Sequence, residues 1–143
     1  MTEDELDEFL REEPICRVAT IGPGGHPHVG ALWFVWDGTA LWLNSLTRSQ
    51  RWTDLDRDRR ISVVVDTGGT DFLQLKGAEL TGRAELVGEA PRTGAPVDEL
   101  REPELLFAGK YAGGRTFAYD GRHAWVRLTP QKIVSWDFAK IRR

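Results

Sequence analysis

Short apolar runs alternate with strong turn sequences over the first third of the chain. Residues 15–21 alternate in the pattern of an extended strand, and Gly22-Pro23-Gly24-Gly25 predicts a turn before a second run at residues 28–36. Asp37-Gly38 is a strong hairpin signal ahead of a third strand at residues 41–43. Because the second run is apolar on both faces, we expect a central strand that is buried on both sides. The segment predicts a three-stranded antiparallel meander.

Helices are few and short. Thr2 and Glu5 have the spacing of a capping box, which predicts an N-terminal helix that ends before Pro14. A further helix is expected over residues 98–110, interrupted at Pro103. The absence of a regular alternation of strands and helices argues against a Rossmann fold.

The rest of the chain favours strands. Residues 72–75 and 78–87 read as two extended segments, or alternatively as one long bent strand in which Gly77 and Gly82 mark bulges. The other expected strands are residues 61–65, 124–128 and 132–136. Short connections favour antiparallel pairing, so we predict a mainly β chain with α, an antiparallel β-barrel with a few short helices packed outside it.

Length and composition limit the class of protein. The 143 residues suggest a single domain covering residues 1–143. The net charge of −3 argues against general binding to nucleic acid. The acidic start of the chain and the lack of an apolar run of about 18 residues argue against a signal peptide and against a membrane protein. We therefore expect a cytoplasmic protein.

The sequence offers little for a metal site or for nucleophilic catalysis. The single cysteine, Cys16, lies in an apolar strand, where packing is the expected role. His26 and His28 share a strand face and His123 lies far along the chain, but no acidic or thiol partner is suitably spaced. We expect no metal, and we name no catalytic residue.

The segment after the third strand has the composition of a phosphate-binding loop. Thr47 and Gln50 have capping-box spacing at the start of a short helix, flanked by Arg48 and Arg51. Free N–H groups at a helix start, the hydroxyls of Thr47 and Ser49, and two guanidinium groups can converge on one anion. The alternative is that a hydroxyl only caps the helix while both arginines face solvent.

Two residue types are over-represented. Fifteen of the 19 basic residues are arginine, and a run of alternating charge at residues 56–60 is expected to be a solvated face. The six tryptophans fit either a core or, taken together, a planar cofactor or a large subunit interface.

The order and spacing of several segments resemble the pyridoxamine 5′-phosphate oxidase-like split β-barrel family, and particularly its flavin/deazaflavin oxidoreductase branch. No single motif is specific, but together they cover most of the chain from residue 17 to residue 141. The segments that carry the resemblance are residues 17–21, 25–29, 32–38, 47–55, 58–63, 82–87 and 127–138.

The resemblance implies an FMN-binding split barrel that forms a homodimer, with two cofactors in grooves between the subunits. It implies that Leu43, Asn44 and Ser45 line the cofactor ring. It also implies that Arg48, Ser49 and Arg51 hold the phosphate, with Gln50 close by.

This chain departs from the family's phosphate motif. Relatives commonly have Ser-Arg-Lys followed closely by Arg-Asn-Leu, whereas the matching residues here are Ser49-Gln50-Arg51 and Thr53-Asp54-Leu55. Two basic positions have become Gln50 and Thr53, and Asp54 would repel a phosphate if it turned toward it.

The function that the resemblance implies is that of an oxidoreductase. The arginine-rich composition and the close likeness of residues 33–38 and 132–137 favour coenzyme F420, with FMN as the alternative cofactor. Reduced F420 supplies a hydride, so the expected activity is reduction of a small, planar, conjugated substrate without an obligatory side-chain acid or base. The alternatives are an FMN-dependent enzyme resembling pyridoxamine-phosphate oxidase and a non-enzymatic protein that binds a flavin, a deazaflavin or haem.

Overall fold

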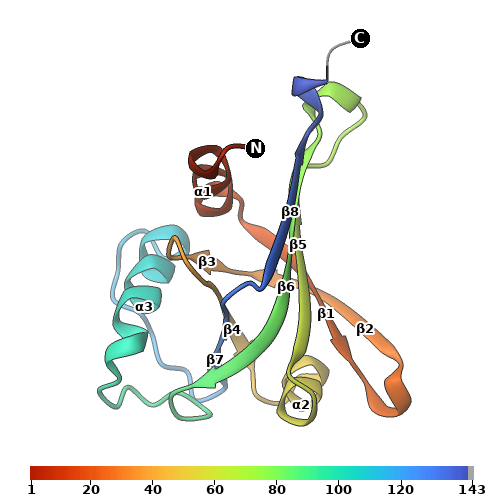
Figure 1. Ribbon diagram of the computed structural model, residues 1–143. Helices are drawn as coiled ribbons and strands as arrows, with labels where there is room; N and C mark the ends of the chain where they lie inside the picture. Colours follow the sequence, from red (N-terminus) through yellow and green to blue (C-terminus); the bar gives the residue numbers. More distant parts are fainter. Residues whose placement is uncertain (142–143) are drawn as a thin grey trace.

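The computed structural model describes residues 1–141, which form a curved antiparallel sheet with three α-helices around it (Figure 1). The helices are α1 (Glu3–Glu12), α2 (Gln50–Arg57) and α3 (Asp98–Tyr111). The strands are β1 (Ile15–Ile21), β2 (Pro27–Trp33), β3 (Val35–Trp36), β4 (Leu41–Leu46), β5 (Arg60–Asp66), β6 (Lys76–Val87), β7 (His123–Leu128) and β8 (Lys132–Asp137).

The long strand β6 joins the two halves of the sheet. The strand order is β2-β1-β5-β6-β7-β4-β3, and β8 pairs with β6 outside this path. Residues 76–81 of β6 pair with β8, whereas residues 84–87 pair with β7. One strand therefore belongs to two differently directed groups of strands, as Figure 1 shows. The prediction of a mainly β, antiparallel split barrel is confirmed.

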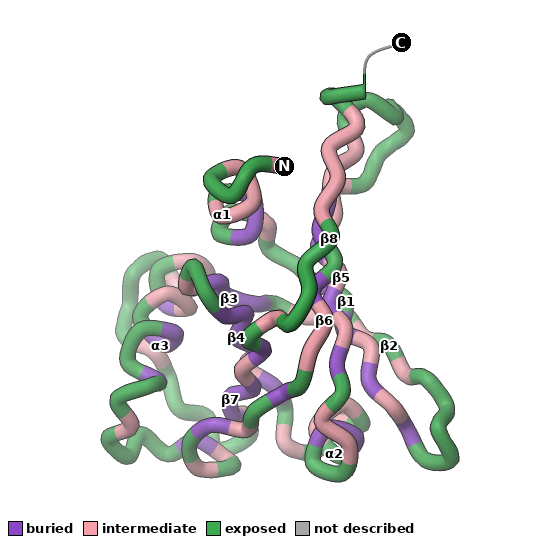
Figure 2. The backbone as a smooth tube through the Cα atoms, viewed as in Figure 1, coloured by how far each residue is buried: buried purple, intermediate pink, exposed green. Residues whose placement is uncertain are grey.

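The core has two parts, which Figure 2 shows as buried segments on the inner strands. The larger part consists of buried apolar residues from β1, β4, β5, β6 and β7, and it is closed by Phe9 and Leu10 of α1 and Leu55 of α2. The smaller part lies under α3 and contains Trp42 and Trp125, whose rings meet edge to face at 6.3 Å. Full burial of each large apolar side chain contributes about 1.5–3 kcal/mol.

Local sequence signals define α1 correctly. The Thr2 hydroxyl accepts the Glu5 N–H, and the Glu5 carboxylate accepts the Thr2 N–H, so the predicted capping box is confirmed.

The predicted interruption of α3 is wrong, because the helix continues through Pro103. Proline removes only one helical hydrogen bond, and the buried face formed by Leu100, Pro103, Glu104 and Ala108 offsets that loss.

Residues 72–75 do not form the predicted strand. Phe72–Gln74 is a 3₁₀ turn capped by Asp71, which accepts the Leu73 N–H. The Phe72 ring stacks on Phe138 at 4.5 Å. This contact with the far end of the chain overrides the local preference for an extended conformation.

The predicted bulges at Gly77 and Gly82 are also wrong, because the register between β5 and β6 is continuous through both residues. Gly77 is needed for close packing, since a Cβ there would lie 2.4 Å from the Trp136 ring. Gly82 lies where β6 changes partner, and a Cβ there would meet Leu128 at 3.1 Å.

The second apolar run is not a central strand within one chain. It breaks at Phe34 into β2, which lies at the edge of the sheet, and the buried β3. Val29 and Trp33 on the outer face of β2 are 67% and 50% exposed. The two-sided apolar pattern therefore leaves one apolar face of β2 open.

Replacing Gly77 by alanine should destabilise the fold. The new methyl group would overlap the Trp136 ring and the Val65 carbonyl oxygen, which lies 2.8 Å from the Cβ position. Overpacking of this kind costs about 1–3 kcal/mol. Urea denaturation followed by tryptophan fluorescence measures the loss. Gly68→Ala is the matched control, because a Cβ there meets nothing within 4 Å. Equal stability of the two variants would contradict this account of Gly77.

Candidate functional site

The turn between β4 and α2 is built around Ser49. Its hydroxyl accepts the Trp52 N–H at 3.1 Å and donates to the Leu46 carbonyl at 2.8 Å, so Ser49 is the N-cap of α2. The predicted capping box at Thr47 is wrong. Both the N–H and the hydroxyl of Thr47 donate to the Arg122 carbonyl, which ties the turn to the segment before β7.

Arg51 turns inward from this turn toward β2. Its Nε donates to the Ser45 hydroxyl at 3.2 Å, and its Nη1 lies 3.5 Å from the Cβ position of Gly30. The guanidinium is partly buried, and burial lowers its pKa from 12.5. Among residues 1–141 it has no carboxylate within 4 Å. A partly buried guanidinium with unused N–H donors has the chemistry to hold an anion.

Arg48 lies on the outside of the same turn. Its side chain is exposed, and it forms no hydrogen bond or ion pair with the part of the chain that the structure describes. The structure thus brings Ser45, Ser49 and Arg51 together and leaves Arg48 at the rim.

Asp54 does not face the turn. Its carboxylate is completely buried and accepts the Thr20 hydroxyl at 2.8 Å and the Gln50 amide at 2.6 Å. Burial acts to raise the pKa of Asp54, but the hydrogen bonds from Thr20 and Gln50 outweigh it and hold this pKa below 3.8. Asp54 therefore fastens α2 to β1, and the Gln50 amide is engaged there.

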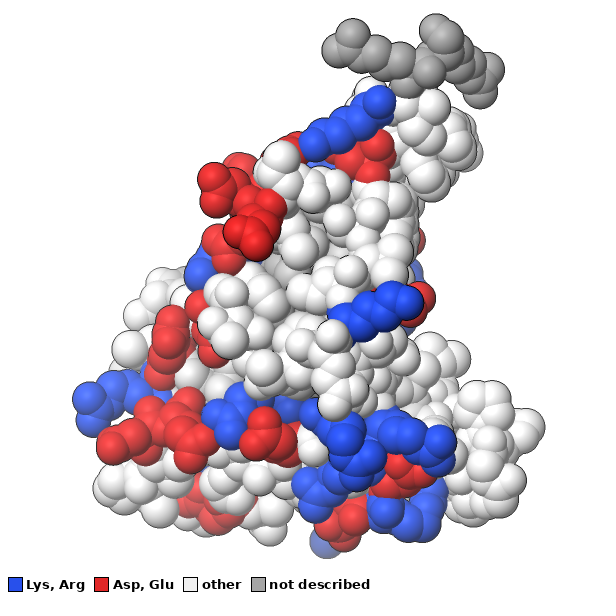
Figure 3. All heavy atoms as spheres, viewed as in Figure 1, with Lys and Arg blue, Asp and Glu red and all other residues white. Residues whose placement is uncertain are grey.

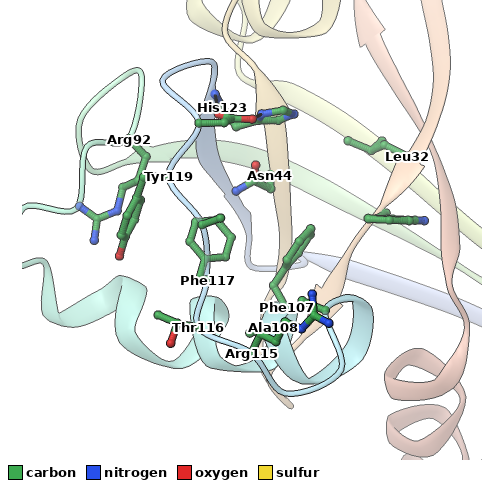
Figure 4. Close-up of a pocket in the computed structure, with 14 residues that line it drawn as sticks. Leu32, Asn44, Arg92, Phe107, Ala108, Arg115, Thr116, Phe117, Tyr119 and His123 are labelled. Carbon is green, nitrogen blue, oxygen red and sulfur yellow. Dashed lines mark hydrogen bonds and ion pairs between the residues drawn. The ribbon is translucent and has the colours of Figure 1, made fainter.

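The three residues predicted to line a ring point in different directions. Leu43 and Ser45 are completely buried on the barrel side of β4. Asn44 points to the opposite side, into a cavity (Figure 4). Its amide nitrogen Nδ2 is buried and has no hydrogen-bond partner in residues 1–141. A buried N–H donor without an acceptor lowers the stability of the fold. Such a donor therefore marks a place where a ligand can accept a hydrogen bond.

The cavity that Asn44 enters has a volume of about 510 Å³ and lies between β2, β4, α3 and the loop after α3. Its lining is mostly apolar, and it combines aromatic side chains with a smaller number of polar groups. Trp33 forms part of the wall and stacks on Tyr111 with 4.4 Å between ring centroids. The lining includes Trp33, Phe107, Phe117, Tyr119, Asn44, Arg92, Arg115, Asp120 and His123.

Arg92 is held within the structure rather than free for a ligand. It is 4% exposed, and its Nε donates to Glu104 at 2.8 Å. Glu104 also accepts the Tyr119 hydroxyl at 2.8 Å and the Trp125 indole N–H at 3.0 Å. The hydrogen bonds that Arg92 donates to Glu104 hold the pKa of Arg92 above its ordinary value. This network fixes the cavity loop to α3 and β7.

The remaining candidates carry no site of their own. Cys16 is completely buried, and burial raises its pKa to about 12, in keeping with the expected packing role. Residues 1–141 contain no group of three His, Cys, Asp or Glu side chains that could hold a metal ion. Basic side chains gather near α2 with acidic ones among them (Figure 3), as expected for a solvated face. None of the helices between residues 1 and 141 is long and apolar enough to span a membrane.

The sequence did not predict the cavity wall from α3 and the loop after it. These residues reach the site only through tertiary packing. The one local signal is the occurrence of three aromatic residues, Phe107, Phe117 and Tyr119, within a short segment of the sequence.

Comparison with known proteins identifies the family. The family model described as pyridoxamine 5′-phosphate oxidase matches residues 2–137, and the chain belongs to this family. The family includes flavin-binding oxidoreductases. No curated protein sequence matches the chain significantly.

Solved structures share the fold. A conserved hypothetical protein from Mycobacterium tuberculosis is 29% identical and has a TM-score of 0.80, over 96% of this chain and 86% of that chain. An F420 reductase is 22% identical with a TM-score of 0.66, over 90% and 94%. The haem storage protein HutZ from Vibrio cholerae is 16% identical with a TM-score of 0.74, over 92% of each chain.

Removing the Asp54 carboxylate should destabilise the protein by about 1–3 kcal/mol at neutral pH, because Asp54→Ala leaves the Thr20 hydroxyl and the Gln50 amide without a partner. Since the pKa of Asp54 is lowered by folding, its contribution is complete above about pH 4 and is lost as the pH falls through the folded value. Urea denaturation at several pH values measures both effects. Asp56→Ala, an exposed aspartate of the same helix, should change little. A constant difference between Asp54→Ala and wild type down to pH 2 would contradict the assignment.

Proposed function

We propose that this protein is an oxidoreductase that binds a tricyclic flavin-type cofactor, with its phosphate at the turn before α2 and its ring along β4. Coenzyme F420 is the favoured cofactor and FMN is the alternative. The observation that carries the proposal is Arg51, a partly buried guanidinium whose protein partner is a neutral hydroxyl rather than a carboxylate.

The turn offers a phosphate several complementary groups. Arg51 supplies an inward-facing guanidinium, Arg48 supplies a second one at the rim, and the first turn of α2 presents N–H groups. Ser49 sets the direction of the helix start through its cap. Gln50 supports the site indirectly, through its hydrogen bond to Asp54.

The edge of β4 suits a planar ring. On one side β4 pairs with β7 along its whole length, but on the other side β3 reaches only residues 41 and 42. The side chains of Leu43 and Ser45 are buried in the barrel. These two residues would therefore contact the ring through their main-chain atoms at the open edge of β4. Asn44 offers its unpaired amide to a polar edge of the ring.

A bound flavin or deazaflavin supplies the hydride or electron pair for the reaction. The protein's own contribution is to hold the phosphate, to orient the ring and to exclude water with the aromatic cavity wall. A small, planar, conjugated substrate suits a cavity of about 510 Å³ with this lining.

We also propose that two copies of the chain form the complete site. The outer face of β2 exposes Val29, Ala31 and Trp33, and Trp33 also lines the cavity. An apolar face next to an open cavity is typical of an interface. The second copy would cover this face and the ring together.

Arg51→Ala should weaken binding of both F420 and FMN by at least about tenfold, because a charge-assisted contact to phosphate is lost. Quenching of tryptophan fluorescence during titration with each cofactor gives the dissociation constants. Arg101→Ala is the control, since this α3 arginine is 79% exposed and far from the turn in sequence. If Arg51→Ala bound both cofactors as tightly as wild type, the assigned phosphate site would be wrong. Tighter binding of F420 than of FMN by the wild-type protein would support F420 as the cofactor.

Val29→Glu should shift the protein toward monomers, because it places a charge on the outer face of β2. Sedimentation velocity over a range of concentrations measures the shift. Leu105→Glu is the matched control, since Leu105 is also exposed, at 69%, but lies on α3. A wild-type protein that sediments as a monomer at all concentrations would contradict the proposed dimer.

A second candidate is a non-enzymatic binding protein. It is favoured by the altered phosphate motif, in which two basic positions have become Gln50 and Thr53 and the Gln50 amide donates to Asp54. Tight binding of a flavin, a deazaflavin or haem without hydride transfer to a panel of enones and quinones would support this candidate over the reductase.

A further inference from the structure

His123 lies at the edge of the cavity, on the same side of the sheet as Asn44. It is the first residue of β7 and pairs with Leu46 of β4, while Asn44 pairs with Trp125 two residues further on. Cross-strand partners share a face, so the imidazole and the Asn44 amide line one cavity (Figure 4).

Asp120 fixes the orientation of this imidazole. Its Oδ2 lies 2.5 Å from Nδ1 of His123, and its Oδ1 accepts the N–H groups of Arg122 and His123 at 2.8 and 3.1 Å. Partial burial acts to raise the pKa of Asp120, but the hydrogen bonds from Arg122 and His123 outweigh it and keep this pKa below 3.8. The carboxylate is therefore ionised at neutral pH and accepts the proton on Nδ1.

The main chain around His123 is fixed as well. The carbonyl of His123 accepts the Arg92 N–H at 2.8 Å, and the carbonyl of Arg122 accepts the Thr47 N–H at 2.9 Å. With Nδ1 engaged by Asp120, Nε2 is the ring nitrogen left for a ligand. It has no hydrogen-bond partner among residues 1–141.

We propose that His123, oriented by Asp120, is the acid–base group of the cavity and acts on the oxygen or α-carbon of a conjugated carbonyl ligand. Asp120 is the positioning residue. The redox role rests on the proposed function, whereas binding of an oxyanion by the His123 imidazolium does not.

The proton balance of the step is complete. A bound reduced flavin-type cofactor would supply a hydride to the β-carbon of the conjugated carbonyl, and the electrons of the C=C bond would move to the carbonyl oxygen to give an enolate. His123 would give the proton on Nε2 to this enolate, which would yield the saturated carbonyl compound and a neutral imidazole. Solvent then restores the proton, because the His123 side chain is 32% exposed.

The charged groups near His123 are few. Asp120 and Arg122 lie on its own segment, Arg115 and Tyr119 come from the cavity loop, and Arg92 comes from the segment after β6. The Arg92 charge is compensated by Glu89 and Glu104. Residues 44–47 of β4 and the turn, which pack against His123, carry no titratable side chain. Asp120 is thus the charge in direct contact with the imidazole.

The probe that tests the site is 4-nitrophenol, a small aromatic whose phenolate form is seen directly in the absorption spectrum. Wild-type protein should bind the phenolate through Nε2 and lower the pKa of the bound phenol. His123→Gln should bind it about tenfold more weakly and without this spectral change. His26→Gln makes the same chemical change on an exposed turn and should behave as wild type. No binding to wild type, or the same affinity and spectrum for His123→Gln, would overturn the proposal.

Asp120→Asn tests the positioning role. The phenolate should be bound more weakly than by wild type, and its absorption spectrum should approach that of the His123→Gln complex, because the imidazole has lost the carboxylate that orients it. An affinity and a phenolate spectrum equal to those of wild type would show that Asp120 does not act on His123.

The cofactor-loaded protein separates this inference from the proposed function. His123→Gln should bind F420 and FMN as wild type does but reduce an enone more slowly, and the pH profile of its rate should differ from that of wild type. If wild type binds neither cofactor, the proposed function fails while the 4-nitrophenol result still decides the role of His123. Equal enone reduction with the same pH profile in both proteins would overturn the acid–base role.

Discussion

The strand β6 changes its hydrogen-bonding partner part of the way along its length, and this change sets the arrangement of the whole sheet. One edge of this strand pairs first with β8 and then with β7, and the change takes place at Gly82. Since backbone hydrogen bonds fix the direction of each neighbour, the bend in β6 sets the angle between the two groups of strands. The space between β4 and β2, which holds both Arg51 and the cavity, follows from that angle.

Two arginines near the cavity differ in the groups to which their guanidinium N–H groups bond, and this difference decides whether each one can bind a ligand. Arg92 and Arg51 are both removed from solvent to a considerable degree, and both lie near the cavity or the turn. Arg92 meets two carboxylates, so its charge is compensated and it stabilises the loop. Arg51 meets a hydroxyl, so its charge remains available. Burial without a counter-ion, rather than arginine content, is what points to an anion site.

Local chemistry was enough to predict much of the fold. The capping box of α1, the turn at Asp37-Gly38 and the strands flanking it depend on neighbouring residues, and all are present. Errors arose where distant contacts decide the outcome. Phe72 stacks on Phe138, and Thr47 bonds to Arg122 so that Ser49 becomes the cap. Neither distant partner can be read from the local pattern.

The sequence predicts the position of the candidate site but not the directions in which its side chains point. The turn and its arginines follow from a local pattern of hydroxyl and basic residues, but the inward direction of Arg51 and the buried position of Asp54 depend on β1 and β2. From the sequence alone, His123 is a candidate only for a distant metal ligand. The useful signal was the acidic residue three positions earlier, because Asp120 and His123 meet across a single turn before β7.

The outer face of β2 is apolar and exposed in the single chain, which bears on the proposed dimer. Its sequence has the two-sided apolar pattern of a buried strand, yet in one chain the strand is at the edge, with Val29 and Trp33 exposed. An edge strand that stays in solvent usually carries charged or otherwise protective residues, and this one carries none between Pro27 and Trp33 apart from the titratable His28. This pattern supports the proposed dimer, in which a second copy would cover that face. Because Trp33 belongs both to that face and to the cavity wall, the same contact that buries β2 would also close the cavity.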